Sequence, residues 1–172
     1  MQKEFSYPLK IETLNRQEQH YLLKANKEQC MFLKDVLQVE DVLEFNSDIY
    51  LKLDPKQHRL DIKGVVSAKL VLKSVISLEN FEKSYEAPFA YFFDTQATYQ
   101  DIKDMEPSIN DEVPDIIENG EIDLGNISIE QLALVIEDYP RQQGEEFSFK
   151  PDFDPQTLHA ENPFSALKKL KK

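Results

Sequence analysis

The sequence predicts an α+β fold, a curved antiparallel sheet with a meander core that is covered by one or two helices. Residues 43–53, 60–72 and 81–93 each alternate apolar and polar side chains over most of their length. Such alternation gives a strand one buried and one solvated face, which is typical of an antiparallel meander. Residues 27–38 and 128–139 carry apolar side chains at helical spacing, so we expect helices there, the second covering the sheet.

The first part of the chain contributes two short strands and the start of the first helix. Residues 5–11 alternate, and Pro8, which cannot donate a ladder hydrogen bond, predicts an edge position for this strand. A second short strand is expected at 19–25. Asn26 is a typical helix N-cap, and Gln29 is its capping-box partner, so the first helix should begin directly after Asn26.

The alternation also predicts details of the three long strands. Leu43 is assigned to the apolar face of the first strand, and residues 54–57 form the turn to the second. Gly64 is expected to mark a bulge that lets the sheet bend. The order of the strands stays open, because alternation assigns faces and not neighbours.

The helices carry further signals. Ser128 and Gln131 form a capping box at the start of the second helix, the apolar stripe runs to Tyr139, and Pro140 ends it. Cys30 lies on the apolar face of the first helix. We expect it to pack there as a small hydrophobic side chain, since no base or cation is evident beside it.

The net charge of the chain restricts the kinds of partner that the protein can bind. The chain has 172 residues, one cysteine, three histidines and a formal net charge of −12 at pH 7. This balance argues against broad duplex binding, which needs cations to neutralise phosphates, and it permits a basic protein partner or a local basic patch. Acidity that serves solubility alone is an equal alternative. The scattered histidines and single cysteine predict no metal site, no cofactor and no disulfide.

The domain organisation follows from the same patterns. We expect one α+β domain over residues 1–140 and an irregular tail over residues 141–172 that ends in a short Lys-rich helix. Residues 94–119 are rich in carboxylates and are interrupted by Pro107 and Pro114, which predicts an extended or mobile acidic connector.

The sequence has no glycine-rich phosphate loop, nucleophile elbow or paired metal-binding histidines, so it supplies no enzyme motif and no catalytic residue. Two binding features remain. The acidic connector either binds a basic segment of a partner or is a solvated loop. The tail helix either contacts RNA or a protein groove, or it is a charged helix end that only packs through its apolar side chains. The candidate partner-binding residues of the connector are Asp101, Asp104, Asp111, Glu112 and Asp115. The candidate contacts of the tail are Arg141, Phe164, Lys168, Lys169, Lys171 and Lys172.

Five groups of residues, in order along the chain, carry a family resemblance. They are 4–9 (EFSYPL), 64–70 (GVVSAKL) with 74–79 (SVISLE), 86–89 (EAPF), 120–125 (GEIDLG) with 130–134 (EQLAL) and 139–141 (YPR), and 161–170 (ENPFSALKKL). The ordered set resembles the YceD family of large ribosomal RNA subunit accumulation proteins, especially its alphaproteobacterial branch. Many members of that family have cysteine where this chain has Ser74, and some have a second where it has Ser77, so sulfur chemistry is excluded at this pair.

The resemblance implies a non-enzymatic ribosome-biogenesis factor that supports accumulation of 23S ribosomal RNA. The expected partner is a basic ribosomal protein or a pre-50S particle, with direct ribosomal RNA contact as a further mode. An RNA-processing or RNA-modifying enzyme, or an interaction module outside ribosome assembly, are the alternatives. No apolar run approaches a membrane span and no signal-peptide core is present, so we expect a cytoplasmic protein with no membrane contact. The oligomeric state is not predicted.

Overall fold

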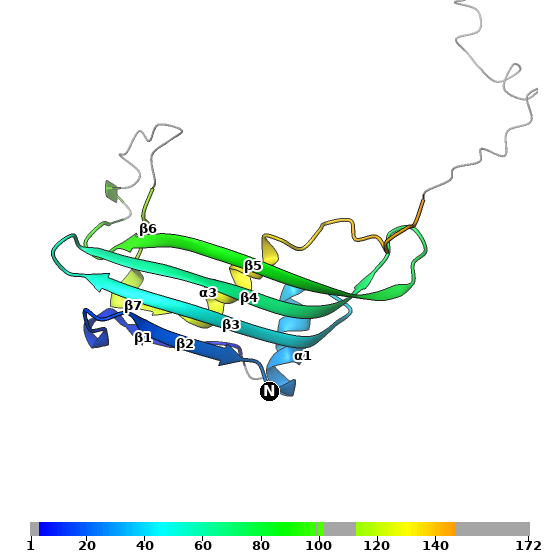
Figure 1. Cartoon of the computed structure of the whole chain (residues 1–172), viewed down its shortest axis with the longest axis horizontal. Helices are drawn as coiled ribbons and strands as arrows, with labels where there is room; N and C mark the ends of the chain where they lie inside the picture. The colour runs from blue at the N-terminus through cyan, green and yellow to red at the C-terminus, as the bar shows by residue number, and fades with distance from the viewer. Residues whose placement is uncertain (1–3, 99, 102–112, 147–172) are drawn as a thin grey trace, which may run out of the picture.

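The computed structural model describes residues 4–98, 100–101 and 113–146, and the largest element in this part of the chain is a five-stranded sheet (Figure 1). The strand order is β2-β3-β4-β5-β6. The bounds are β2 Gln19–Lys24, β3 Asp41–Asp54, β4 Arg59–Lys73, β5 Asn80–Asp94 and β6 Asp115–Ile116. Strands β2 to β5 pair antiparallel, and β6 pairs parallel with β5. The predicted meander is therefore confirmed, with one short parallel strand added at its edge.

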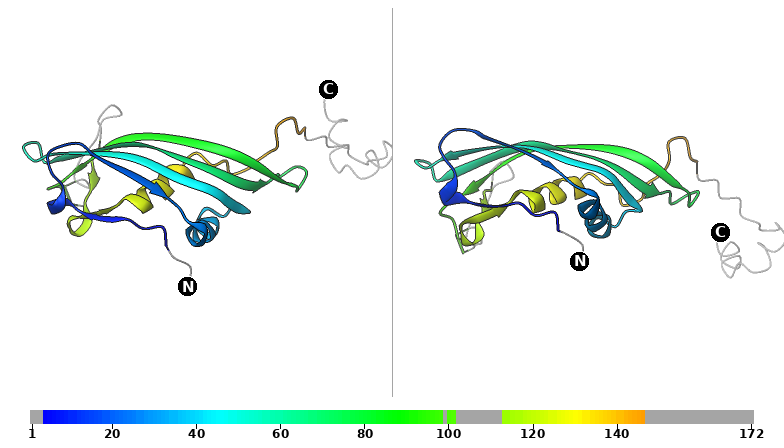
Figure 2. Two further views of the ribbon diagram at one scale, coloured as in Figure 1. Left: turned by 60° about the horizontal axis from the view of Figure 1, so that its bottom comes forward. Right: turned by 90° about the horizontal axis from the view of Figure 1, so that it is seen from below.

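Two helices lie on one face of this sheet, and Figure 2 shows the long strands bowed over them. The helices are α1, Lys27–Leu37, and α3, Leu124–Ala133. The remaining elements are the antiparallel pair β1 Pro8–Lys10 and β7 Glu121–Asp123, and the 3-10 turns η1 Ile11–Thr13 and η2 Glu118–Gly120. We call the sheet face toward the helices the inner face and the opposite face the outer face. The architecture is the curved α+β fold that the sequence predicts.

The inner face holds the hydrophobic core, because it receives every second side chain of the long strands. On β4 the buried set is Leu60, Ile62, Val66, Ala68, Leu70 and Leu72. Phe45 of β3 is 1% exposed and packs edge-to-face on Phe5, with 4.9 Å between the ring centroids. Leu124 and Leu132 of α3 are fully buried against the same layer. Removing these apolar side chains from water is the main force that holds the helices on the sheet.

Helix α1 begins as the capping box predicts. Asn26 Oδ1 accepts a hydrogen bond from the Gln29 N–H, and Gln29 Oε1 accepts one from the Asn26 N–H, both at 3.0 Å. The helix ends at Leu37, where Gln38 takes a left-handed conformation with φ of 54°. Cys30 packs partly buried against the core, and burial raises the pKa of its thiol. The predicted packing role of Cys30 is confirmed.

The predicted inward position of Leu43 is wrong. The register between β3 and β4 shifts between Val42 and Glu44. A bulge of this kind inserts one residue and reverses the side-chain alternation on one side of it. Val42 is therefore buried at 4% exposure, whereas Leu43 is 41% exposed.

The predicted bulge at Gly64 is also wrong, because Gly64 lies in regular register between Ile49 and Phe89. A β-carbon at this position would lie 2.4 Å from the Asp48 carbonyl oxygen and 3.0 Å from the Phe89 ring. Glycine is needed here because the backbone of β3 and the ring of Phe89 leave no space for a side chain.

The predicted bounds of the second helix, 128–139, are wrong at both ends. Helix α3 starts four residues earlier because Asp123, and not Ser128, is its N-cap and accepts hydrogen bonds from the N–H groups of Gly125 and Asn126. Ser128 lies inside the helix.

The buried hydroxyl of Ser128 has two partners. Ser128 Oγ lies 2.7 Å from the Leu124 carbonyl oxygen and 2.7 Å from Ser47 Oγ on β3. This contact fastens α3 to the sheet. The helix ends at Ala133, so Tyr139, which was assigned to its apolar stripe, is 74% exposed.

The predicted first strand, 5–11, is reduced to Pro8–Lys10, which pairs with β7 and leaves its other edge open, as Pro8 requires. Within the acidic connector, Asp115–Ile116 forms β6, whereas residues 102–112 and the predicted tail helix lie outside the described residues. No helix in the part of the chain that the structure describes is long and apolar enough to cross a lipid bilayer.

Candidate functional site

The outer face of the sheet carries charged side chains with aromatic rings among them. The register places His20 of β2 beside Tyr50 of β3, and Tyr50 beside Lys63 of β4. In the neighbouring row, Phe92 of β5 lies opposite Asp61 of β4. The alternation predicts polar side chains on this face, so aromatic rings here do not serve the core.

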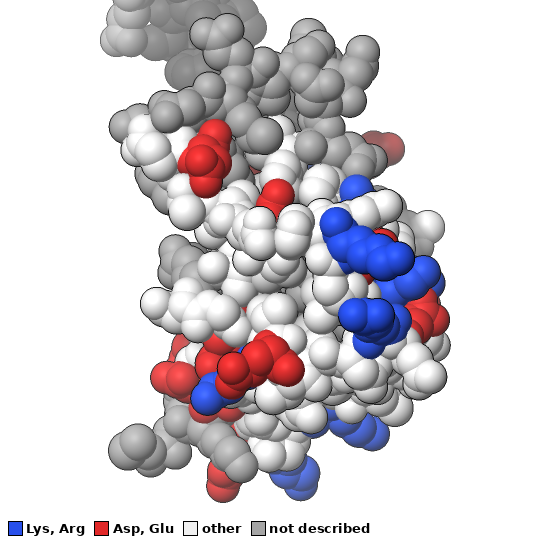
Figure 3. All heavy atoms as spheres, turned by 90° about the vertical axis from the view of Figure 1, so that its left-hand side faces the viewer, with Lys and Arg blue, Asp and Glu red and all other residues white. Residues whose placement is uncertain are grey.

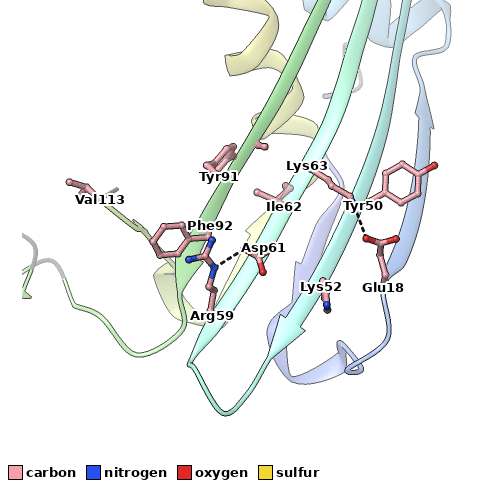
Figure 4. Close-up of a pocket in the computed structure, with 11 residues that line it drawn as sticks. Glu18, Tyr50, Lys52, Arg59, Asp61, Ile62, Lys63, Tyr91, Phe92 and Val113 are labelled. Atoms are coloured by element: carbon pink, nitrogen blue, oxygen red, sulfur yellow. Dashed lines mark hydrogen bonds and ion pairs between the residues drawn. The ribbon is translucent and has the colours of Figure 1, made fainter. Parts of the chain in front are cut away.

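These rows border a groove of about 580 Å³ at the end of the sheet next to the β3–β4 turn (Figure 4). Ala90 of β5 lies opposite Lys63, and its small side chain leaves a hollow beside the larger Phe92. Tyr50 lies across β4 from Ala90 and borders the hollow on the other side. The groove is open, and its lining comes mainly from the three neighbouring strands β3, β4 and β5, with Glu18 and Val113 added from the segments before β2 and β6.

Three cations and two carboxylates line this outer-face groove. Arg59 Nε donates to Asp61 Oδ1 at 2.6 Å, and Lys63 Nζ donates to Glu18 Oε1 at 2.8 Å (Figure 4). The hydrogen bond from Lys63 lowers the pKa of the Glu18 carboxyl, and the same bond raises the pKa of Lys63, so both groups stay charged at neutral pH. Lys52 has no carboxylate within ion-pair distance among the described residues.

Aromatic rings and cations in and beside the groove contact one another. The Arg59 guanidinium carbon lies 3.8 Å from the centroid of the Phe92 ring, a cation–π contact. The His20 and Tyr50 rings are stacked, with 4.4 Å between centroids and 11° between planes. Lys63 Nζ lies 5.6 Å from the Tyr50 ring centroid. These contacts fix the positions of the Tyr50 and Phe92 rings and of the Arg59 guanidinium.

The lining of the groove has a small excess of cations over carboxylates, three against two, although the whole chain is acidic. Figure 3 looks onto this end of the molecule and shows Lys and Arg side chains gathered along one side, with most of the visible Asp and Glu side chains elsewhere. The cations of β3, β4 and their connecting turn at this end are Lys52, Lys56, Arg59 and Lys63. A local excess of cations in an acidic protein can attract an anionic ligand to one place.

A second polar cluster lies at the opposite end of β4, in the segment 74–79. The Ser74 and Ser77 hydroxyls both donate to the Glu145 carboxylate, and these bonds lower its pKa. The Val75 N–H donates to the Pro140 carbonyl oxygen at 3.0 Å. Ser74 is fully buried. This Ser-clamp therefore fastens the segment that follows α3 to the β4–β5 connection.

Two of the five predicted connector residues lie in the described part of the chain, and each has a different environment. Asp101 accepts hydrogen bonds from the Thr98 hydroxyl and N–H, which lower its pKa. Asp115 pairs with Phe93 in the sheet, and burial raises its pKa. The residues Asp104, Asp111 and Glu112 lie outside the described residues.

Of the predicted tail contacts, only Arg141 is described, and it is exposed. It makes no ion pair with another described residue. The others, Phe164, Lys168, Lys169, Lys171 and Lys172, lie outside the described residues. No three His, Cys, Asp or Glu side chains in the described ranges lie close enough together to hold a metal ion.

Sequence reasoning missed the outer-face groove, although the signal for it is present. Tyr50 and Phe92 occupy outward positions of two strands whose inward positions are mostly apolar. Arg59 and Lys63 occupy outward positions of β4 between them. Strand pairing had to be known before these residues could be placed side by side.

Comparison with known proteins gives one match. No curated protein and no solved structure matches the chain. The family model described as "Large ribosomal RNA subunit accumulation protein YceD" matches residues 62–171, which is more than half of the chain. The match begins within β4 and includes the Ser-clamp. It confirms the resemblance at the level of the family, while the alphaproteobacterial branch stays a prediction. The chain belongs to the YceD family of large ribosomal RNA subunit accumulation proteins.

Proposed function

We propose that this protein is a non-enzymatic cytoplasmic factor that supports accumulation of 23S ribosomal RNA by binding a basic ribosomal protein or a precursor of the large subunit. The family match over residues 62–171 is the observation that carries this proposal. The family is described by accumulation of the large ribosomal RNA subunit, so membership supports the process, and the charge of the chain supports the mode of action.

The charge of the chain favours a basic partner. A formal net charge of −12 attracts basic proteins and raises the rate at which they associate with this chain. The same charge favours solubility of the unbound protein. In the sequence, the acidic connector leads directly into the edge strand β6, which begins at Asp115. A basic segment bound there would lie next to a rigid sheet.

Sedimentation of a gently prepared cell lysate tests the process. We expect the protein to travel with immature large-subunit particles and to leave them when the salt concentration is raised, because exposed charge contacts are screened by salt. Depletion of the protein should lower the amount of 23S ribosomal RNA relative to 16S. A protein found only at the top of the gradient at low salt, with unchanged 23S ribosomal RNA on depletion, would contradict the proposal.

A neutralised variant tests the role of the connector. It replaces Asp101, Asp104, Asp111, Glu112 and Asp115 by their amides. The matched control makes the same change in net charge at exposed carboxylates elsewhere, namely Glu12, Glu79, Glu121, Asp138 and Glu146. We expect the connector variant to lose particle binding and the control to keep most of it. Equal loss in both would mean that total charge, and not the connector, binds the partner.

A further inference from the structure

We propose that the outer-face groove binds a single-stranded segment of RNA, an inference that rests on the proposed role in ribosomal RNA accumulation. Phosphates of the strand contact the cations at this end of β3 and β4, and exposed bases stack on the aromatic rings. The groove thereby gives the protein a direct contact with RNA in addition to the contact made by its acidic residues.

The cations provide the phosphate-binding surface. Lys52 has no carboxylate within ion-pair distance among the described residues, so its ammonium can meet a phosphate without breaking such a pair. Arg59 and Lys63 are paired with Asp61 and Glu18, but both pairs are exposed to water. Exposed ion pairs are weak, so a phosphate can compete for these cations.

The rings provide the base-binding surface. Tyr50 and Phe92 lie on the two sides of β4 and are offset by two residues along it, so strand spacing and rise put their backbones roughly 12 Å apart. The hollow over Ala90 lies between them and leaves room for a flat group. Arg59, stacked on Phe92 at 3.8 Å, adds a planar cation to the same surface. Nucleobases of any sequence can stack on such rings, because every base has a π-face.

The combination of rings and cations favours a single strand over other anionic ligands. A duplex keeps its base faces inside the stack, so it could use the cations but not Tyr50 or Phe92. An acidic peptide would also complement Lys52, Arg59 and Lys63, but most of its side chains have no flat face for the rings. Dependence of binding on both groups of residues therefore identifies the ligand.

Fluorescence anisotropy with the full-length protein tests the proposal. The probe is a fluorescein-labelled oligouridylate of about 12 nucleotides, within the usual footprint of single-strand binding proteins. The competitors are an RNA duplex of equal length and an acidic peptide of equal charge. We expect the oligouridylate to bind at about 50 mM salt, to bind more weakly at about 200 mM, and to bind more tightly than either competitor.

Ring variants test the stacking. We expect Tyr50→Leu with Phe92→Leu, which keeps apolar bulk but removes both π-faces, to weaken oligouridylate binding at least tenfold. The corresponding alanine pair should do the same if its thermal melt shows that it is folded. Tyr139→Leu is the matched control, because this ring is 74% exposed and lies beyond the other end of the helix layer. The control should bind as the unaltered protein does.

Charge variants test the phosphate contacts. Replacing Lys52, Arg59 and Lys63 by glutamine should reduce the slope of log affinity against log salt by about 2, since each lost contact to a single strand removes about 0.7. The matched control replaces three cations nearer the other end of the same face, Lys24, Lys69 and Lys73. Its slope should change by less than half as much.

The proposal is overturned if the unaltered protein does not bind the oligouridylate at low salt, if the duplex or peptide displaces it more effectively than unlabelled oligouridylate, or if both leucine substitutions leave its affinity unchanged. These results would leave the proposed function intact as long as the protein still travels with large-subunit precursors. Conversely, oligouridylate binding without that association would overturn the proposed function and keep the groove as an RNA site.

Discussion

The inner and outer faces of the sheet are built from the same strands and differ in almost every property. On β4 the inner positions are buried apolar side chains, and the outer positions include Arg59, Asp61, Lys63 and Lys69. The inner face is covered by α1 and α3, whereas the outer face has neither helix on it (Figure 2). Of two consecutive residues on a strand, one therefore packs in the core and the other forms part of the exposed surface.

This difference separates stability from recognition. A substitution on the inner face changes the packed core, where a change in volume of even one methylene group alters stability. A substitution on the outer face changes charge or ring contacts with little effect on folding. The chain can thus vary its outer surface without loss of fold, and experiments can change one face at a time.

A pair of phenylalanine substitutions tests this separation with the largest expected effect. Phe45→Ala should lower the free energy of unfolding by about 3–5 kcal/mol, because it leaves a cavity at a side chain that is 1% exposed. Phe92→Ala on the outer face should cost about 1 kcal/mol or less. Urea unfolding followed by circular dichroism measures both. Equal losses would show that the outer face is also part of a packed interface.

Two adjacent residues at the bulge sharpen the comparison. Val42→Ala should cost about 2 kcal/mol, since Val42 is 4% exposed on the inner face. Leu43→Ala should change the free energy of unfolding by about 0.5 kcal/mol or less, although leucine is the larger side chain, because the bulge turns it outward. The reverse order would place Leu43 in the core and remove the bulge.

The cap of α3 makes a modest contribution to stability, and this contribution depends on pH. Burial by itself would raise the pKa of Asp123, but hydrogen bonds from the Ser6 hydroxyl and from the N–H groups of Tyr7, Asn126 and Gly125 outweigh it and lower the pKa. A lowered pKa in the folded state means that the unfolded state binds the proton more readily. The stabilisation by Asp123 is therefore present above the ordinary aspartate value of about 3.9, and it is lost as the pH falls through the folded-state value.

Asp123→Asn isolates this contribution. At pH 7 the variant should be less stable by about 1 kcal/mol, because neutral hydrogen bonds replace charge-assisted ones while asparagine still caps the helix. Denaturation at a series of pH values should show the two proteins converging as the pH falls. A constant difference across the series would mean that the charge of Asp123 contributes nothing.

The sequence predicted elements whose signal is local and missed those that depend on tertiary contacts. The capping box at Asn26 and the alternation of the long strands need only near neighbours, and both are confirmed. The start of α3 was missed because Ser128 has the residue type of a cap, yet its hydroxyl is committed to Ser47 across the core. The stripe to Tyr139 was also misleading, since the helix ends before it.

The candidate site was less predictable than the fold. The carboxylates and lysines singled out from the sequence stand out as runs along the chain, and most of them lie outside the described residues. The groove instead draws Tyr50, Lys63 and Phe92 from three strands, and only strand pairing makes them neighbours. Runs of like charge are visible in a sequence, whereas a surface assembled across strands becomes visible only with the register.

The Ser-clamp fixes Pro140 and Glu145 to the connection between β4 and β5. Glu145 is held beside Ser74, just beyond one end of β4, and Arg59 of the groove lies at the other end. The strand between them has 15 residues and spans roughly 46 Å at about 3.3 Å per residue. Strand β4 therefore sets the separation between the Ser-clamp and the groove. Lengthening or shortening the tail would leave that separation unchanged, because it is measured along the strand and not along the tail.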